Sequence, residues 1–266
     1  MIRSETPDIL KNIVAAVQER LSHEPAVPGL ERRAREAAGV RRRGGGRSLH
    51  SALTLPGVRV IAECKRRSPA RGWLRQPFDP AALARAYQQG GAAAVSVVTE
   101  PAFFAGQPGW LPLVRQMVTL PVLQKDFLVS PRQVAEASLL GADAVLLIVR
   151  LLPGNLLAEM QAVAAELELE VLAEVHGEAD MERALDSGAP IIGINARDLS
   201  TFQVDLEAAA DLAARVPADR LVVVESGVGS RADVQGMVAR GLRRFLVGEH
   251  LVRSADPAAA LAELMS

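Results

Sequence analysis

Short apolar runs rich in valine, isoleucine and leucine alternate along most of the chain with longer segments whose apolar residues recur at helical spacing. The short runs predict strands at 58–65, 94–99, 121–125, 144–148, 170–175, 191–195, 221–225 and 244–248. The longer segments predict helices at 80–89, 111–118, 131–140, 155–167, 178–187, 206–216, 230–240 and 257–265. This repeated alternation of β and α units in one chain predicts a closed (β/α)₈ barrel.

An open, doubly wound sheet is the alternative arrangement for the same order of elements. Such a sheet usually binds a nucleotide through a glycine-rich fingerprint after its first strand. Neither G-x-G-x-x-G nor a Walker sequence follows residues 58–65. The closed barrel is therefore the better explanation of the pattern.

The residues before the first strand carry a helical pattern of their own. Ile9, Ile13, Val17 and Leu21 form an apolar stripe, which predicts an amphipathic helix over 7–23. We divide the chain into an N-terminal helical extension, 1–56, and a barrel, 57–266, and expect the two to form one domain.

Residues 31–47 are rich in arginine and include three consecutive glycines, which mark a flexible connection. The simplest interpretation is a solvated helix face followed by a loop. A second interpretation is a positive rim that attracts an anionic substrate. Nucleic-acid binding has the least support, because no binding motif or interleaved aromatic residue accompanies the arginines.

Composition and charge exclude several classes of protein. The chain has 266 residues, 49% of them hydrophobic and only 3% aromatic, so aliphatic side chains must build the core. The net charge of −1 gives no general attraction to nucleic acid or anionic lipid. Cys64 is the only cysteine, which excludes an internal disulfide and a thiolate metal cluster. Glu5, Asp8 and Lys11 interrupt the N-terminal apolar residues and no run is long enough to span a membrane, so we expect a cytoplasmic protein.

Ionic and polar residues close several of the expected strands at the same, C-terminal end. They are Glu63 and Lys65, Lys125, Glu174, Asn195 with Arg197 two residues on, and Glu225. In a closed barrel these side chains converge at one mouth, where barrel enzymes carry their active sites. A structural ion-pair network is the alternative interpretation, but residues that serve stability usually collect at the opposite face.

The loops after the last two expected strands are typical of a phosphate site. Ser226 and Gly227 begin a turn of small residues whose backbone N–H groups can face an anion. Gly248 and Glu249 follow the last strand, where a short helix commonly points its N-terminus at phosphate. The alternative is that these glycines only permit tight turns, but the occurrence of two such loops favours phosphate.

Other side chains give weaker signals. Cys64 alternates outward from its strand and should pack as a small hydrophobe against a helix. His176 either lines the pocket or is an ordinary loop histidine, and we favour the loop. No histidine has metal-ligand spacing, and no G-x-S-x-G sequence indicates a serine hydrolase. Four aromatic residues have two possible roles: they form an aromatic wall for a planar substrate, or they simply anchor loops. They are Trp73, Phe103, Phe104 and Trp110.

Several of these segments together carry a family resemblance. In chain order they read I-A-E-C-K-R-R-S-P-A-R-G, V-L-Q-K-D-F, L-A-E-V-H, G-I-N-A-R-D-L, V-V-E-S-G-V and F-L-V-G-E. The sequence resembles the indole-3-glycerol phosphate synthase family, which closes the indole ring in tryptophan biosynthesis. The resemblance implies a (β/α)₈ barrel with extra N-terminal helices over the barrel mouth, and a lyase without metal or cofactor.

The resemblance also implies roles for the site residues. The family closes, decarboxylates and dehydrates 1-(o-carboxyphenylamino)-1-deoxyribulose 5-phosphate, a sequence of steps that needs both proton donors and a base. By resemblance, Lys125 is the general acid for ring closure, and Glu174 is the general base or stabilises positive charge on the anilino nitrogen. Lys65 binds the substrate anion and donates the later proton, and Glu63 orients it. The remaining residues would position hydroxyls and carboxylate (Asn195, Arg197, Glu225) or hold the phosphate (Ser68, Ser226, Gly227, Gly248, Glu249).

Two other functions compete with this hypothesis. The first is another phosphosugar barrel, such as a relative of phosphoribosylanthranilate isomerase, which rearranges its substrate without releasing CO₂. The second is a sugar-phosphate-binding barrel that has lost turnover, which would be expected to show a gap in the charged ring, and no such gap is present. In each case the partner is a small phosphorylated molecule; nucleic acid and membranes are not expected, and the sequence names no protein partner.

Overall fold

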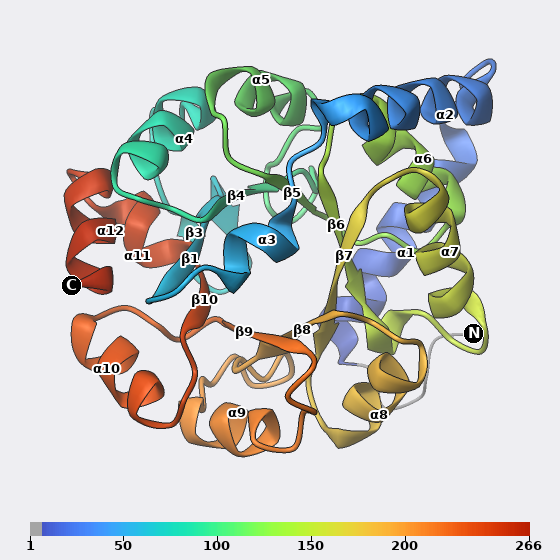
Figure 1. Ribbon diagram of the computed structural model, residues 1–266. Helices are drawn as coiled ribbons and strands as arrows, with labels where there is room; N and C mark the ends of the chain where they lie inside the picture. The colour runs from blue at the N-terminus through green and yellow to red at the C-terminus, as the bar shows by residue number, and fades with distance from the viewer. Residues whose placement is uncertain (1–6) are drawn as a thin grey trace.

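The computed structural model describes residues 7–266, and eight parallel strands at its centre close into a barrel (Figure 1). Around the barrel the order of neighbours is β1-β10-β9-β8-β7-β6-β5-β4. The strands are β1 (Arg59–Cys64), β4 (Ala94–Val98), β5 (Val122–Lys125), β6 (Ala144–Ile148), β7 (Glu170–Val175), β8 (Ile191–Asn195), β9 (Leu221–Glu225) and β10 (Arg244–Val247). The predicted (β/α)₈ barrel is confirmed, and the open doubly wound sheet is excluded.

Helices cover the outside of the barrel between successive strands. They are α4 (Pro80–Gln89), α5 (Trp110–Met117), α6 (Pro131–Leu140), α7 (Leu156–Glu166), α8 (Glu178–Asp186), α9 (Leu206–Ala213), α10 (Arg231–Ala239) and α12 (Pro257–Met265). The side chains of Asp79, Ser130, Asp205, Ser230 and Asp256 accept hydrogen bonds from backbone N–H groups in the first turns, which fixes where five of them begin. The clearest difference from prediction is α9, which stops short of residue 216 because Pro217 disfavours helical backbone at the residue before it.

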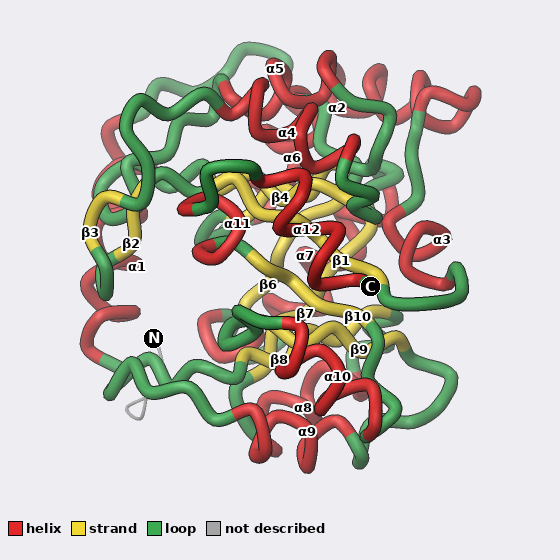
Figure 2. The backbone as a smooth tube through the Cα atoms, turned by 90° about the vertical axis from the view of Figure 1, so that its left-hand side faces the viewer, coloured by secondary structure: helices red, strands yellow, loops and turns green. Residues whose placement is uncertain are grey.

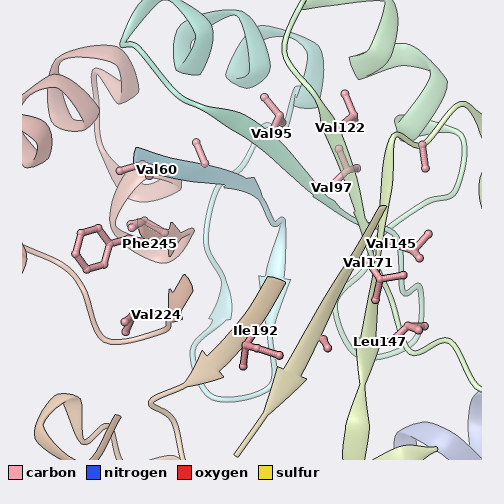
Figure 3. Packing of buried hydrophobic residues seen from close by; sticks show 14 of the residues in the cluster. Val60, Val95, Val97, Val122, Val145, Leu147, Val171, Ile192, Val224 and Phe245 are labelled. Atoms are coloured by element: carbon pink, nitrogen blue, oxygen red, sulfur yellow. The ribbon is translucent and has the colours of Figure 1, made fainter. Parts of the chain in front are cut away.

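Alternation along the strands sorts apolar side chains into two layers. Residues such as Val60, Val145, Ile192 and Phe245 point outward and pack under the helices (Figure 3). A second cluster of buried residues fills the barrel interior; it includes Ile61, Leu123, Leu172, Val223 and Leu246. Cys64 belongs to the outer layer, with its Sγ 3.8 Å from the backbone oxygen of Pro80 at the start of α4, as predicted.

The N-terminal extension closes both ends of the barrel. Its elements are α1 (Asp8–His23), α2 (Leu30–Val40), a π-helical turn η1 (Arg41–Gly45) and α3 (Leu49–Thr54); residues 1–6 of the predicted extension lie outside the described residues. Figure 2 shows α1 and α3 at opposite ends of the barrel. Leu10 and Val14 of α1 join the interior cluster from the mouth, whereas Leu49 and Leu53 of α3 join it from the other end. Among the extra helices, the mouth is therefore covered by α1, while α2 packs along the outside against α6.

The arginine-rich segment does not form a positive rim at the mouth, so that interpretation is wrong. Arg41 donates from its guanidinium to the backbone oxygen of Leu167 at 2.9 Å, and Arg47 donates to that of Leu120 at 3.0 Å. The backbone N–H of Arg47 also donates to Asp143 Oδ1 at 3.1 Å. These acceptors precede strands β7, β5 and β6, at the end of the barrel away from the mouth. The segment fastens the extension to that end instead.

No helix within residues 7–266 combines the length and the apolar character needed to cross a membrane.

Candidate active site

One cavity at the C-terminal ends of the strands brings together every residue that the sequence suggested for catalysis or substrate binding. Its lining includes Glu63, Lys65, Ser68, Lys125, Glu174, Asn195, Arg197, Glu225, Ser226, Gly227, Gly248 and Glu249. The loop after β1 folds into a short hairpin of β2 (Arg67–Ser68) and β3 (Gly72–Trp73) beside this cavity. Segments distant in the chain therefore meet at one mouth.

Four charged side chains form the uppermost layer of the barrel interior, which we call the charged layer: Glu63, Lys125, Glu174 and Glu225. They come from alternate strands, β1, β5, β7 and β9, which is how a barrel builds each inner layer. Lys125 Nζ lies 3.0 Å from Glu174 Oε2 and 3.2 Å from Glu225 Oε2. Lys65 Nζ lies 2.5 Å from Glu63 Oε1. The three carboxyl groups are almost wholly buried, so the ammonium groups of Lys65 and Lys125, rather than water, are their charged neighbours.

The charged layer holds its lysine as a cation. Burial by itself lowers the pKa of Lys125, but the neighbouring carboxylates of Glu174, Glu225 and Glu63 raise it well above the usual range. Burial likewise raises the pKa of Glu174, but the Lys125 ammonium, His176 and Asn195 together hold it well below the ordinary value. The pair is therefore an ammonium beside a carboxylate at neutral pH.

Glu225 behaves differently from Glu174 although both lie beside the same lysine. Burial raises the pKa of Glu225 to about 8, and the negative charge of Glu174 adds to the shift, while Lys125 opposes it. Apart from the Lys125 ammonium 3.2 Å from Oε2, neither carboxyl oxygen of Glu225 has a polar partner among the described residues. Its carboxyl group therefore carries a proton over most of the neutral range, and Glu225 belongs to the lining of the cavity.

The raised pKa of Glu225 predicts a pH dependence of stability. In the unfolded chain this carboxyl titrates near its ordinary 4.5, and in the folded chain near about 8. The folded state binds the extra proton between these values, so the stability that Glu225 contributes is complete below the lower pKa and lost as the pH rises through the higher. We therefore expect Glu225→Gln to gain stability over the wild type between about pH 5 and about pH 9 in urea unfolding. A constant difference in unfolding free energy across this range would contradict the assignment.

Glu174 is fixed by polar groups on more than one side. Asn195 Nδ2 donates to Glu174 Oε1 at 3.1 Å, and the amide oxygen of Asn195 in turn accepts from the backbone N–H of Arg197 at 3.0 Å. His176 Nε2 lies 3.1 Å from the same Glu174 oxygen, and its side chain is only 4% exposed. His176 does lie in the loop after β7, as favoured from the sequence, but it is buried against Glu174. Its position two residues after Glu174, on the same side of the strand, was the signal for this contact.

The two glycine-containing loops close the cavity next to the charged layer. Ser226 and Gly227 both have left-handed backbone, with φ of 67° and 85°, which makes the chain turn tightly after β9. Ser230 and Asp233 cap the start of α10, because Ser230 Oγ accepts from the Asp233 N–H at 3.2 Å and donates to its carboxylate at 2.8 Å. The short helix α11 (Glu249–Arg253) follows β10 directly, and Gly248 and Glu249 at its start line the cavity.

The apolar side of the cavity was largely missed from the sequence. Phe104 and Phe127 line it with their rings 5.9 Å apart, and they face the same space as Ile9, Leu10 and Ile13 of α1. Of the four proposed wall residues only Phe104 lines the cavity. Trp110 packs on Phe78, with ring centroids 4.9 Å apart, and Trp73 is 49% exposed beneath the guanidinium of Arg66. Phe127 appeared in the sequence analysis only as the last letter of the segment V-L-Q-K-D-F.

Asp126 is a second residue that the sequence did not single out. It lines the cavity yet is buried, accepting from Thr99 Oγ1 at 2.5 Å and from the Phe127 N–H at 2.8 Å. Burial raises the pKa of this carboxyl group despite these hydrogen bonds. The contacts hold the start of the loop after β5, and with it Phe127, against the mouth.

The fold and the cavity define a (β/α)₈-barrel protein whose mouth combines paired ammonium and carboxylate groups, an aromatic wall and small-residue loops. The model of one family, indole-3-glycerol phosphate synthase, matches residues 10–264. An indole-3-glycerol phosphate synthase from Acidovorax sp. (strain JS42) is 43% identical over 272 residues, covering 97% of this chain and 99% of that protein. The chain belongs to the indole-3-glycerol phosphate synthase family, and its function is that of this carboxy-lyase of tryptophan biosynthesis.

Solved structures with the same fold are more distant in sequence. A thiamine phosphate pyrophosphorylase from Pyrococcus furiosus has a TM-score of 0.61 at 19% identity, covering 78% of this chain and 93% of that one. A mutant tryptophan synthase alpha-subunit, also from Pyrococcus furiosus, has a TM-score of 0.59 at 16% identity, covering 77% and 97%. At these identities the likeness concerns the barrel alone.

Proposed function

We propose that the charged layer carries the acid–base steps of the indole-forming reaction and that the loops after β9 and β10 hold the substrate phosphate. The observation that supports this most directly is the position of the Lys125 ammonium between two buried carboxyl groups. One of them, Glu174, is ionised, and the other, Glu225, is protonated at neutral pH. Groups pushed apart in pKa by their surroundings are typical of acid–base pairs in active sites.

Lys125 is the general acid for ring closure. As the aryl carbon of 1-(o-carboxyphenylamino)-1-deoxyribulose 5-phosphate attacks the ketone carbon, the C=O π-bond breaks and the Lys125 ammonium donates a proton to the oxygen. The substrate carboxylate then leaves as CO₂, and its bonding electrons restore the aromatic ring. Because the carboxylates beside Lys125 keep it protonated, the donor is present throughout the neutral range.

Glu174 is the base of this site, or stabilises positive charge on the anilino nitrogen during closure. Its low pKa keeps it ionised, and Asn195 and His176 fix its direction. In the dehydration step one proton is removed and the hydroxyl leaves as water, with Lys65 donating the proton that the hydroxyl needs. Glu63 lies 2.5 Å from Lys65 and orients it.

The remaining polar residues position the substrate rather than exchange protons with it. Ser68 and the loops at Ser226-Gly227 and Gly248-Glu249 hold the phosphate, next to the charged layer. Asn195, Arg197 and Glu225 bond the hydroxyls and the carboxylate. Phe104 and Phe127 offer an apolar, aromatic surface against which the aryl ring packs.

Product formation from the purified chain tests this proposal. We expect indole fluorescence to appear on addition of the substrate in the presence of EDTA, with one CO₂ released per indole formed, because the proposed steps use only side chains of the protein. Rearrangement of an aminoribose phosphate without CO₂ release would support the isomerase alternative instead. Tight substrate binding in calorimetry without any product would support the binding-protein alternative.

A further inference from the structure

The inner face of β8 carries a glycine where a side chain would be expected. Gly193 lies between Ile191 and Asn195 on the face that points into the barrel, and both of those residues have side chains there. A glycine inside a strand weakens it and often marks a close approach by another group. The approaching group here is the carboxyl of Glu225 on the neighbouring strand β9.

The space that a Cβ of residue 193 would occupy is already filled by Glu225. An ideal Cβ at Gly193 would overlap Glu225 Oε1 and lie 3.2 Å from Glu225 Cδ. The other oxygen of the same carboxyl group lies 3.2 Å from Lys125 Nζ. The carboxyl therefore rests across the bare backbone of Gly193 while it faces the lysine.

The same arrangement occurs a second time in the charged layer. An ideal Cβ at Gly248 would overlap Glu63 Oε1 and lie 3.1 Å from Glu63 Cδ. Gly248 follows β10, the strand that pairs with β1, just as β8 pairs with β9. Two carboxyl groups of the charged layer thus rest on glycines, one within the adjacent strand and one directly after it.

We propose that Gly193 is a positioning residue of the active site, whose missing side chain lets the Glu225 carboxyl lie within reach of Lys125 and the substrate. The inference rests on the proposed function, since it explains how Glu225 is held in its place there. A methyl group at position 193 pushes the carboxyl away, and a displacement on the order of 1 Å in an active site costs about 10²-fold in rate.

The neighbours of Gly193 indicate that a methyl group there affects catalysis more than folding. The atoms it meets are the far end of the Glu225 side chain and, at 3.3 Å, a Leu172 methyl group, and both can move. Gly106 is the opposite case, because a Cβ there would lie 2.5 Å from the backbone oxygen of Val98. An alanine is thus tolerated by the barrel at 193, with the cost falling on the carboxyl group.

Gly193→Ala tests the inference, with Gly236→Ala as the matched control because a Cβ at that helical position meets nothing within 4 Å. We expect kcat of Gly193→Ala to be about 10²-fold lower than that of the wild type. The circular dichroism spectrum of Gly193→Ala should match that of the wild type. Gly236→Ala should keep the wild-type kcat. Wild-type kcat in a folded Gly193→Ala would overturn the inference while leaving the proposed function intact. Absence of indole product from the wild type would remove the proposed function itself.

A double-mutant cycle separates positioning from a general effect on the barrel. Gly193→Ala introduced into Glu225→Ala should lower kcat less than threefold, because the group it displaces is already absent. An additional loss as large as in the wild type would mean that Gly193 does not act through Glu225. If the Gly193→Ala protein is unfolded, and the double variant with Glu225→Ala is unfolded too, the role of Gly193 is purely structural. That result would also overturn the inference.

Discussion

Replacement of Lys125 by methionine is expected to lower kcat by about 10²–10⁴-fold, the usual cost of losing a general acid. Methionine has a similar length and no proton to give, so the ketone oxygen must collect its proton from water during ring closure. Lys125 is also the cation nearest both Glu174 and Glu225, and its loss leaves two buried carboxyl groups facing each other. The pKa of Glu174 should then rise, because its largest stabilising influence is gone.

The measurement is the steady-state rate of indole fluorescence at saturating substrate, together with a denaturant unfolding curve. Lys11→Met is the matched control, since Lys11 is a half-exposed residue of α1 that pairs with Asp8 and does not line the cavity. Equal kcat in the Lys125 variant and the control would remove Lys125 from the mechanism. If the Lys125 variant were unfolded, Lys125→Arg, which keeps the buried cation but donates a proton poorly, would separate the structural from the catalytic effect.

The barrel and the charged layer were predictable because both depend on simple periodicities. Apolar runs of strand length, each followed by a helical segment, are sufficient for the (β/α)₈ fold. Strand alternation then places Glu63, Lys125, Glu174 and Glu225 inward at the C-terminal ends, where they meet once the barrel closes. No knowledge of loop conformation is needed for either step.

The features that were missed depend on how separate segments dock. Arg41 and Arg47 look like surface charges in the sequence, but their guanidinium groups bond backbone oxygens at the far end of the barrel. α3 is too short for a clear helical period, yet Leu49 and Leu53 seal the interior cluster there. Phe104 and Phe127 approach each other only because two loops fold over the mouth. These placements are set by tertiary packing, which a single sequence does not encode in any local pattern.

The position of the Glu225 carboxyl group on Gly193 is likewise set by tertiary packing. A glycine in a strand reads as a weak point, and its function appears only when the carboxyl group from the neighbouring strand is seen resting on it. By this inference the charged layer needs a glycine beside the Glu225 carboxyl group in addition to its charges. This requirement connects the G-I-N-A-R and V-V-E-S-G segments, which carry Gly193 and Glu225 on paired strands.

The second large effect is expected for Glu174→Gln, which should lower kcat by about 10²–10⁴-fold. Glutamine keeps the shape of the side chain, and its oxygen can still accept from Lys125 or Asn195, so the cavity should stay assembled. It has no negative charge, and therefore neither removes a proton nor stabilises charge on the anilino nitrogen.

The result is read from single-turnover product formation and from the unfolding midpoint, with Glu182→Gln on the exposed face of α8 as control. Glu174→Asp distinguishes the two roles, since it keeps the charge but withdraws the carboxylate by one methylene. A base must touch the proton it removes, so if Glu174 is the base, Glu174→Asp should be nearly as slow as Glu174→Gln. If the carboxylate instead stabilises charge at a distance, Glu174→Asp should retain most of the wild-type rate. A wild-type rate in Glu174→Gln would show that Glu174 is not the base. Another residue of the charged layer would then have to serve as the base.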